Sequence, residues 1–389
     1  MKSIKNANLR NKHVVLRVDF NVPIEKGKVT DDARINEVLS TISYILEKGG
    51  SVIIISHLGR PGGKKVSALS LAPVAKKLEK LLGKKVEFLT ETVGAKAREK
   101  ASALKPGQIM MLENLRFSPY EELNDRAFAE KLAGLGNIFV QEAFSNAHHA
   151  HASMVAITDY LPSYAGLHFA KEYEMLSDIL NEPKKPFVFI AGGKKTETKV
   201  EALRGISQKA DIILLGGGLA NTFLMAEGYE VGRSFYEEEY VSDAEQALRD
   251  AFDSGCEVLL PQDVMVARNI SKDTKEKEKD IEQIEADDII ADIGPKTISK
   301  YAQPIKFAGT IVWNGPLGIF EYKSFQAGTR GVASLIQESH AVAVVGGGDT
   351  LAALKELNIK EDFTYVSTAG GAMMEFLAGN KMPGVEALK

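Results

Sequence analysis

AVAVVGGGDT, residues 341–350, is the most informative segment of this sequence. Its apolar run ends at three glycines, and a segment with helical spacing, LAALKEL, begins directly after Thr350. A short buried strand that ends in glycines and opens a helix is typical of a parallel α/β sheet. Glycine N–H groups at a helix N-terminus bind phosphate, and Asp349 is placed to hold Mg²⁺. A plain glycine turn capped by Asp349 is the alternative interpretation of this stretch.

Short apolar runs of the same kind recur along the chain and alternate with segments of helical spacing. In the first half the runs are residues 13–18, 52–55, 86–89, 109–112 and 138–140. In the second half they are residues 187–190, 212–215, 258–260, 310–313, 342–345 and 364–366. This alternation predicts two doubly wound, Rossmann-like domains, each a parallel sheet covered on both faces. Residues 167–180, stopped by Pro183 and Pro186, are predicted to form a hinge helix between the domains.

Composition restricts the class of protein. A chain of 389 residues, 44% hydrophobic and 26% charged, suits a globular protein of two domains. Its formal net charge of −4 argues against a nucleic-acid partner. The single cysteine, Cys256, excludes an intrachain disulfide, and neither a signal peptide nor a membrane-spanning run is seen. The sequence therefore predicts a cytoplasmic protein without a membrane partner, and a solvated loop at residues 272–280.

Basic side chains follow successive strands of the first half. The carboxyl ends of parallel strands meet at one edge of a sheet, so these residues are expected to lie together. They are Arg34, His57, Arg60, Arg116, His148, His149 and His151. A single arginine is most simply a surface ion pair, but several at successive strand ends predict a pocket for a small, multiply charged anion.

Glycine turns and lysines follow the strands of the second half, in GGKKTETK, GGGLANTF and WNGPLGIFE. Glycines let the backbone approach a base or a phosphate closely. Lys195 and Lys199 share one face of an incipient helix, where positive charge opposes the helix dipole unless an anion binds. Glu321 is a candidate acceptor for ribose hydroxyls. Neither G-x-G-x-x-G nor a P-loop motif is present.

Taken in order, these motifs resemble the phosphoglycerate kinase family. The matching segments are RVDFNVP, DDARI, SHLGRP, LENLRF, GGKKTETK, GGGLANTF, DIGPKT, WNGPLGIFE, GGGDT and STAGGA. The resemblance implies reversible phosphoryl transfer between 1,3-bisphosphoglycerate and ADP, giving 3-phosphoglycerate and ATP with Mg²⁺, by a monomer. It also implies a triose domain, residues 1–168 with the tail 372–389 packed on it, a nucleotide domain, residues 169–371, and a ligand cleft between the two lobes.

The resemblance further implies the roles of individual residues. The triose contacts would be Asp19, Asn21, Arg34, His57, Arg60, Arg116 and, at the position of a family arginine, His149. The nucleotide contacts would be Gly193, Lys195, Lys199, Gly217, Gly218, Asn314, Pro316, Gly318, Glu321, Gly346, Gly347, Gly348, Asp349 and Thr350, with Asp349 the magnesium ligand. Arg34, Lys195, Gly347 and Gly348 would stabilise the transferred group, with no general base needed because the attacking carboxylate is already ionised.

Five positions depart from the family pattern. His149 replaces an arginine, Gln141 and Glu142 replace an Asn-Asp pair, Lys194 replaces an alanine, and Ala369 replaces a glycine. A neutral imidazole lacks the bidentate fork of arginine, which predicts weaker and more pH-dependent binding of 3-phosphoglycerate. If position 369 needs a positive φ, its alanine costs about 1 kcal/mol.

These departures motivate two further interpretations of the sequence. One is a catalytically weakened, phosphoglycerate-kinase-like protein that binds nucleotide without turnover. The other is an NAD-linked dehydrogenase, against which the missing G-x-G-x-x-G counts.

Overall fold

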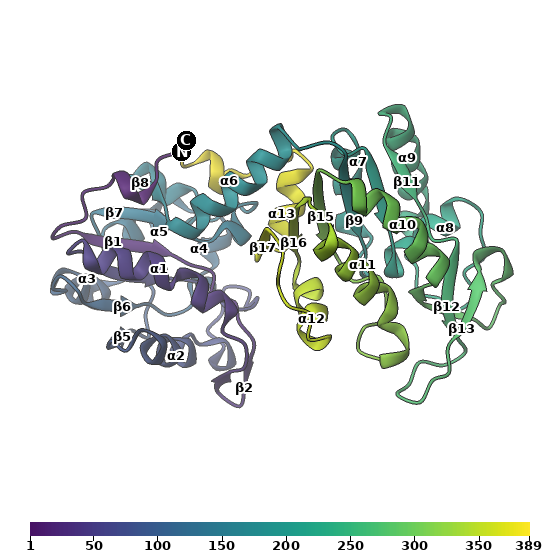
Figure 1. Cartoon of the computed structure of the whole chain (residues 1–389). Helices are drawn as coiled ribbons and strands as arrows, with labels where there is room; N and C mark the ends of the chain where they lie inside the picture. The colour runs from purple at the N-terminus through teal and green to yellow at the C-terminus, as the bar shows by residue number, and fades with distance from the viewer. The chain divides into compact units, whose positions relative to one another are not determined.

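The computed structural model describes residues 1–389, apart from the side chain of Thr198. The chain divides into two compact units (Figure 1). Unit 1 comprises Met1–Glu174 and Lys381–Lys389, and unit 2 comprises Met175–Asn380. Helix α6 (Leu167–Asn181) begins in unit 1 and ends in unit 2. The C-terminal residues return to unit 1, where the backbone N–H of Gly384 donates to Ala147 O at 2.8 Å.

Unit 1 is built on a six-stranded parallel sheet with the order β5-β6-β4-β1-β7-β8. Its strands are β1 (His13–Arg17), β4 (Ser51–Ile55), β5 (Val86–Phe88), β6 (Ile109–Met111), β7 (Ile138–Gln141) and β8 (Ser163–Ala165). Its helices are α1 (Ala33–Glu47), α2 (Ala72–Leu82), α3 (Ala95–Ser102), α4 (Pro119–Glu122), α5 (Arg126–Ala133), the start of α6, and α14 (Pro383–Glu386). A small hairpin is formed by β2 (Ile24–Glu25) and β3 (Lys28–Val29).

Alternate residues of the central strands enter two different cores, which explains why helices cover both faces of this sheet. Val14 and Leu16 of β1 pack with residues of α1 and α2. Val15, which lies between them, packs with residues of α3 and α5. Successive side chains of a strand point to opposite faces, so a strand buried on both faces is apolar throughout. The uninterrupted apolar runs of the sequence therefore predicted the doubly wound architecture correctly.

Unit 2 repeats this architecture with the strand order β11-β10-β9-β15-β16-β17, all parallel. Its strands are β9 (Phe187–Ala191), β10 (Ile212–Leu215), β11 (Glu257–Leu259), β15 (Thr310–Asn314), β16 (Val342–Gly346) and β17 (Tyr365–Ser367). Its helices are α7 (Glu197–Ser207), α8 (Gly217–Ala226), α9 (Val241–Asp253), α10 (Pro295–Phe307), α11 (Ala327–Glu338), α12 (Gly348–Glu356) and α13 (Gly371–Leu377). Ile311 and Trp313 pack with residues of α10, α11 and α12, while Val312 between them is equally buried.

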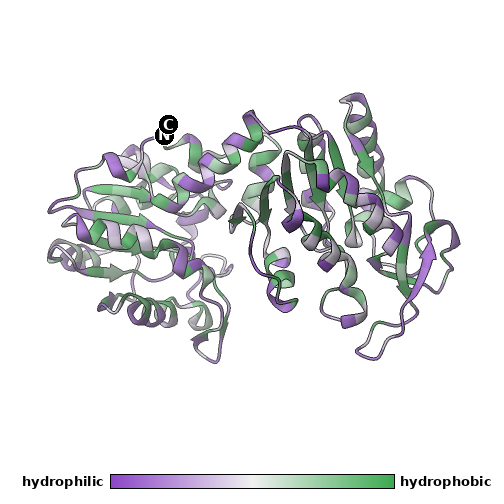
Figure 2. Cartoon of the chain, in the orientation of Figure 1, coloured by the Kyte–Doolittle hydropathy of each residue, from purple (hydrophilic) through white to green (hydrophobic). Residues whose placement is uncertain are grey.

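A second, smaller sheet in unit 2 lies outside the sequence-based expectation. It is antiparallel, with the order β13-β12-β14, formed by β12 (Asp263–Ala267), β13 (Lys277–Asp280) and β14 (Ile289–Ile293). The prediction of a loop at residues 272–280 is therefore wrong for its second half, which pairs with β12. Every residue of β13 is charged, and Figure 2 shows this strand in the hydrophilic colour. Charged residues suit an edge strand because they discourage pairing with another chain.

Single 3₁₀ turns complete the secondary structure. They are η1 (Ile4–Asn6), η2 (Ser67–Leu69), η3 (Leu115–Phe117), η4 (Phe144–Asn146), η5 (Ala156–Asp159), η6 (Glu238–Tyr240), η7 (Ile281–Gln283) and η8 (Lys323–Phe325). Among the described residues, no helix is long and apolar enough to cross a bilayer. The backbone strain considered for Ala369 is absent, because the non-glycine residues with positive φ in the described chain are Asn11, Lys26, Asn124 and Asn358.

Glu142 ties the end of β7 to the first turn of α6. Its buried carboxylate accepts hydrogen bonds from the backbone N–H groups of His168 and Phe169, each at 3.1 Å, and from the hydroxyl of Thr41. The first N–H groups of a helix lack intrahelical partners and carry partial positive charge, so they stabilise a carboxylate. Burial outweighs these bonds and raises the pKa of Glu142 to about 7. Gly166 packs so tightly that a Cβ there would lie 1.9 Å from a carboxylate oxygen of Glu142. This departure from the family pattern thus supports the fold.

We predict that Glu142→Gln lowers the free energy of unfolding by about 1–3 kcal/mol, because an amide has one acceptor oxygen for three donors and leaves a buried donor unpaired. Urea unfolding of the full chain, followed by circular dichroism, measures the change. Glu130→Gln, an exposed substitution on α5, is the matched control. Equal stability of the two variants would contradict this role for Glu142.

Candidate active site

The register of the unit 1 sheet gathers the segments that carry its predicted site residues. Arg17, the last residue of β1, pairs with Ile55 of β4 and with Gln141 of β7. The three strands therefore end at the same level, and the loops that follow them leave from one edge of the sheet. Ligands of open parallel sheets bind at this carboxyl edge.

Asp19 is the centre of the hydrogen bonds at this edge. Its Oδ2 accepts from Arg34 Nη1 at 2.6 Å and from the hydroxyl of Ser145 at 2.5 Å, and its Oδ1 accepts from the backbone N–H of Asn21 at 2.9 Å. His57 Nδ1 lies 4.0 Å from the other side of the carboxylate. Burial opposes ionisation of the Asp19 carboxyl, but the facing cations and donors outweigh it and hold its pKa below the usual value.

Asn21 and Arg116 hold the turn that carries Arg60. Asn21 Oδ1 accepts from the backbone N–H of Gly59 at 2.9 Å, while Arg116 Nη1 donates to Gly59 O at 2.9 Å. Asn114 in turn fixes the backbone of Arg116 by accepting its N–H at 3.1 Å. Burial lowers the pKa of Arg116, the carboxylates of Glu122 and Glu121 oppose that shift, and the positive charge of Arg60 adds to it. The Arg116 guanidinium also pairs with an acid, since its Nε lies 3.1 Å from Glu122 Oε1.

His149 lies close enough to Arg60 and Arg116 to interact with their charges, and its own side chain is uncharged at neutral pH. Its ring stacks on that of His151, with centroids 5.0 Å apart and an interplanar angle of 8°. Burial, and then the charges of neighbouring groups that include Arg116 and Arg60, lower the pKa of His149 to about 4. We name Arg34, His57, Arg60, Arg116 and His149 the basic cluster. At neutral pH its positive charge comes from the three arginines, since burial also lowers the pKa of His57 well below its usual value.

Two residues of this edge were missed by the sequence analysis. Arg17 is fully buried, with Nε donating to the hydroxyl of Ser153 at 2.9 Å and Nη2 lying 3.4 Å from His57 Nδ1, so it supports the imidazole of His57. An arginine that ends an otherwise apolar strand was the signal for it. Ser145, which donates to Asp19, carried no signal in the sequence because its loop placement depends on the fold.

We predict that His149→Arg raises the affinity for 3-phosphoglycerate about tenfold at pH 7.5, because a permanent charge-assisted hydrogen bond is worth roughly 1.5 kcal/mol. The gain should shrink toward pH 5.5, where a bound anion favours the imidazolium of wild-type His149. Calorimetric titration across this pH range measures both effects. His149→Gln is the neutral control, and an unchanged affinity and pH profile in His149→Arg would refute the prediction.

In unit 2 the sheet register brings four segments to one edge. Ala191 of β9 pairs with Leu215 of β10 and with Asn314 of β15, and Asn314 pairs with Gly346 of β16. The segments beyond these residues are in backbone contact, since Gly193 N–H donates to Pro316 O at 2.6 Å. Gly217 has φ +61°, and a Cβ there would lie 2.8 Å from both Gly193 N and Pro316 O. Only glycine suits that position.

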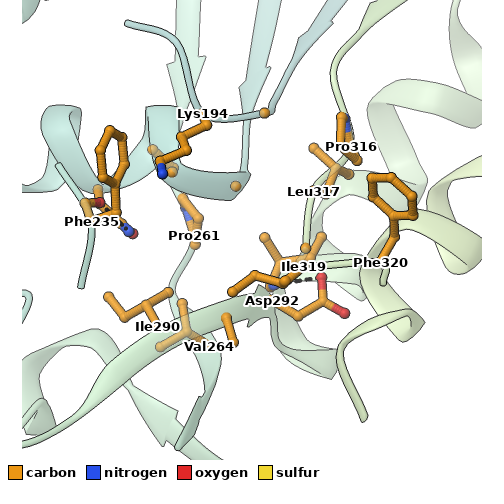
Figure 3. A pocket seen from close by; sticks show the side chains of 18 of the residues that line it. Lys194, Phe235, Pro261, Val264, Ile290, Asp292, Pro316, Leu317, Ile319 and Phe320 are labelled. Carbon is orange, nitrogen blue, oxygen red and sulfur yellow. Dashed lines mark hydrogen bonds between the residues drawn. The ribbon is translucent and has the colours of Figure 1, made fainter. Parts of the chain in front are cut away.

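A cavity of about 430 Å³ opens beside this edge (Figure 3). Figure 3 shows Lys194 beside Phe235 on one side of it and Pro316, Leu317 and Phe320 on the other. Its walls are mostly apolar, and its size suits a planar base with its sugar. The predicted nucleotide residues that line it are Gly193, Gly217, Gly218, Pro316, Gly318, Glu321 and Asp349.

The remaining predicted nucleotide residues form a polar cradle next to the cavity. Thr350 Oγ1 accepts from Gly315 N–H at 2.7 Å and donates to Gly346 O at 2.8 Å, and Asn314 Nδ2 donates to the same carbonyl at 3.2 Å. Gly347 has φ +101°, and a Cβ there would lie 2.8 Å from Asn314 Nδ2. A Cβ on Gly348 would meet nothing within 4 Å, so this glycine borders open space. The turn can therefore receive a phosphate.

Lys199, Lys195 and Asp349 lie close enough to influence one another electrostatically. Burial lowers the pKa of Lys199 to about 8, Asp349 opposes that shift and Lys195 adds to it. The ammonium group of Lys199 donates to Gly192 O, which points it along the glycine turn. The described residues contain no group of three or more His, Cys, Asp or Glu suited to a metal ion. A single carboxylate such as Asp349 fits Mg²⁺, which takes one or two carboxylates and completes its shell with water and phosphate oxygens.

Asp292 is a cavity residue to which the sequence analysis gave no role, although the motif DIGPKT contains it. Its carboxylate accepts from the backbone N–H groups of Gly328 at 2.7 Å and of Ile293 at 2.9 Å. Burial raises the pKa of Asp292 to about 8 despite these bonds. A Cβ on Gly318 would lie 2.3 Å from its Oδ1, so Asp292 fixes the segment of Gly318 against β14.

We predict that ADP affinity falls as pH rises through about 8, because deprotonation of Lys199 removes a phosphate partner. Bound phosphate favours the ammonium and raises the pKa of Lys199, so the affinity falls progressively between the pKa of the free protein and that of the complex. Lys199→Arg keeps its charge and should flatten this decline, whereas Lys199→Met should bind weakly at every pH. Calorimetry between pH 6.5 and 9.5 measures the three profiles. An alkaline decline that persists in Lys199→Arg would assign it to another group.

An arginine-rich anion site at one sheet edge, and a base-sized cavity with a glycine and lysine cradle at another, define a nucleotide-dependent phosphotransferase. The chain belongs to the phosphoglycerate kinase family, whose model matches residues 4–380. The phosphoglycerate kinase of Dictyoglomus turgidum is 45% identical over 387 residues, which cover 99% of this chain and 98% of the relative. That of Moorella thermoacetica is 44% identical over 386 residues, with the same coverage.

Solved structures agree with this family. The phosphoglycerate kinase from Coxiella burnetii has a TM-score of 0.89 and 42% identity, covering 99% of this chain and 98% of that one. The enzyme from Pyrococcus horikoshii has a TM-score of 0.87 and 33% identity, covering 100% and 98%. The predictions of the fold class, the family and a glycolytic phosphotransferase are therefore confirmed.

Proposed function

We propose that unit 1 binds the triose and unit 2 binds the nucleotide in the reaction of the family, the reversible transfer of a phosphoryl group from 1,3-bisphosphoglycerate to ADP. This assignment rests on the different groups that lie at the carboxyl edges of the two sheets. Arginines surround Asp19 at one edge, and lysines border a glycine cradle beside an apolar cavity at the other.

In unit 1 the basic cluster would hold the phosphate and carboxylate groups of 3-phosphoglycerate. Arg60 and Arg116 carry charges that oppose each other in the free protein, so an anion between them relieves repulsion as well as gaining hydrogen bonds. Asp19, held ionised by Arg34, is a hydrogen-bond acceptor and would receive the hydroxyl of the triose. Asn21 would position the turn that bears Arg60.

In unit 2 the base and ribose would occupy the cavity, with Glu321 accepting from ribose hydroxyls. The phosphates would lie in the cradle, against Lys195, Lys199 and the N–H groups of Gly347 and Gly348. Asn314 and Thr350 hold the shape of that cradle. Asp349 would hold Mg²⁺, which supplies neutralisation of phosphate charge when bound.

Transfer in the direction of ATP consumption begins with the ionised carboxylate of 3-phosphoglycerate, so no residue has to remove a proton. Its oxygen attacks the γ-phosphorus in line as the bond to the β-phosphate oxygen breaks, and ADP leaves. Lys195, Arg34 and the glycine N–H groups would stabilise the charge on the transferred group. Two ligands bound to different units must be brought together for this step, and residues 167–180 and 367–371 are the proposed hinges.

The proposal also covers the state of the protein in the cell. The family and the single cysteine support a cytoplasmic monomer. Sedimentation of the purified chain tests the oligomeric state.

We predict that Lys195→Ala lowers turnover at least about 100-fold, because it removes a cation from the transferred phosphoryl group. A coupled assay with 3-phosphoglycerate, ATP and varied Mg²⁺ measures the effect at several pH values. Lys300→Ala, an exposed change on α10, is the control. Calorimetric binding of ADP to each variant shows that the nucleotide site is intact.

The competing proposal is a catalytically weakened nucleotide-binding protein. It is supported by His149, whose lowered pKa leaves the imidazole uncharged at neutral pH. It would be favoured if the wild-type chain bound ADP but showed no magnesium-dependent turnover at any pH. Turnover that survives in Lys195→Ala would instead overturn the role of that lysine.

A further inference from the structure

Lys195 lies in a short segment between two anchored residues. Before it, Gly193 is fixed through both of its backbone groups, because its N–H donates to Pro316 O at 2.6 Å and its carbonyl oxygen accepts from Leu219 N–H at 2.9 Å. After it, Thr196 is fully buried and directly precedes α7. The described residues give the exposed side chain of Lys195 no hydrogen bond or ion pair. Its position therefore depends on how firmly the backbone on either side is held.

Glu237 holds Thr196 from a distant part of the chain. Its carboxylate accepts a hydrogen bond from the backbone N–H of Thr196, the N-cap residue of α7. In a capping box this N–H would be satisfied by an acid at the third helical position, which here is Lys199. The partial positive charge at a helix N-terminus also favours a carboxylate. Glu237 thus supplies the acceptor that the helix itself lacks.

A hydroxyl of α8 closes this contact into a ring. Oγ1 of Thr222, which is fully buried, accepts from the backbone N–H of Glu237 at 3.2 Å and lies 3.2 Å from Oγ1 of Thr196. The segment that bears Glu237 is further fixed by Asn221, whose Nδ2 donates to Phe235 O at 2.9 Å. We name Thr196, Thr222 and Glu237 the α7 clamp. It joins the start of α7 to α8 through two side chains and one backbone group.

Of the two lysines assigned to phosphate, Lys195 depends more on the α7 clamp. Lys199 has a contact of its own, because its ammonium group donates to Gly192 O. Its backbone N–H also donates to Thr196 O at 2.9 Å in the first turn of α7. Lys195 precedes the helix and lacks both kinds of support. Release of Thr196 would therefore displace Lys195 first.

We propose that Glu237 is a positioning residue, which acts through the backbone of Thr196 to fix where Lys195 presents its ammonium group. This inference rests on the proposed role of Lys195 in stabilising the transferred phosphoryl group. The described residues that line the nucleotide cavity do not include Glu237, so its effect on the reaction passes through Lys195. In-line transfer needs close alignment, and a displacement of about 1 Å can lower a rate by up to about 100-fold.

Coupled assays with 3-phosphoglycerate and ATP, and calorimetric titration of ADP, test the proposal in the full chain, with thermal melts to show that each variant is folded. Glu237→Ala should lower kcat about tenfold and change the KM for ATP and the affinity for ADP less than about twofold. Glu237→Gln keeps an acceptor oxygen for the N–H of Thr196 and should retain kcat within about twofold. Glu238→Ala is the matched control, because it removes an exposed carboxylate one residue further along. It should leave all three quantities unchanged.

A double-mutant cycle with Lys195→Ala distinguishes positioning from a general structural role. In the Lys195→Ala protein, Glu237→Ala should lower kcat less than about twofold further, because the group that it positions is gone. A further tenfold loss there would overturn the inference, as would a wild-type kcat in Glu237→Ala or a loss confined to ADP affinity. If Glu237→Ala does not fold, Thr222→Val completes the same cycle. It removes only the hydroxyl that accepts from Glu237 N–H and should lower kcat about threefold.

The two proposals fail in distinguishable ways. If Lys195→Ala keeps the turnover of the wild-type chain, the proposed role of that lysine is lost together with this inference. If Lys195→Ala loses turnover but Glu237→Ala has the same effect with and without Lys195, only the inference is lost.

Discussion

The register of parallel strand pairing is the constraint on which both candidate sites depend. In each sheet the last residues of neighbouring strands pair directly, as Arg17 does with Ile55 and Asn314 does with Gly346. Burial specifies this register, because a slip by one residue would move each row of side chains from its own core to the opposite one. The apolar strands therefore do more than supply stability. They bring several loops to one edge of the sheet. Polar residues that are far apart in the sequence therefore lie close together there.

The two edges use this common geometry to build anion sites from different chemical groups. In unit 1 most polar groups are side chains, and His57 and Arg34 face one acid, Asp19, whose ionisation they favour. In unit 2 the polar groups are mainly backbone N–H and carbonyl groups exposed by glycines, with lysines added at the side. Guanidinium groups reach an anion through long side chains, while a glycine turn lets the anion touch the main chain. The first arrangement suits a small acid, and the second suits a polyphosphate.

Much of this could be predicted from the sequence because apolar runs and glycine turns act locally. The strands of both parallel sheets were found in this way, except β8, whose short sequence SYA carries no periodic signal. The β12–β14 sheet was missed because β13 is wholly charged and becomes a strand only through pairing with Asp263–Ala267. Arg17, Ser145 and Asp292 were missed as site residues because their importance lies in partners far away in sequence. The role of Glu142 likewise depended on contacts that no spacing reveals.

The backbone contact between Gly193 and Pro316 has a consequence for the thermodynamics of ligand binding. Because folding already fixes these two turns against each other, the conformational entropy of the cradle is lost before any phosphate arrives. Little further ordering of the backbone then opposes association, and the free energy of the phosphate contacts is expressed as affinity. The cost falls on the folding equilibrium instead, so a substitution at Gly193, whose φ is +80°, would weaken the native state as well as the site. Stability and ligand affinity are therefore coupled through the same few main-chain atoms.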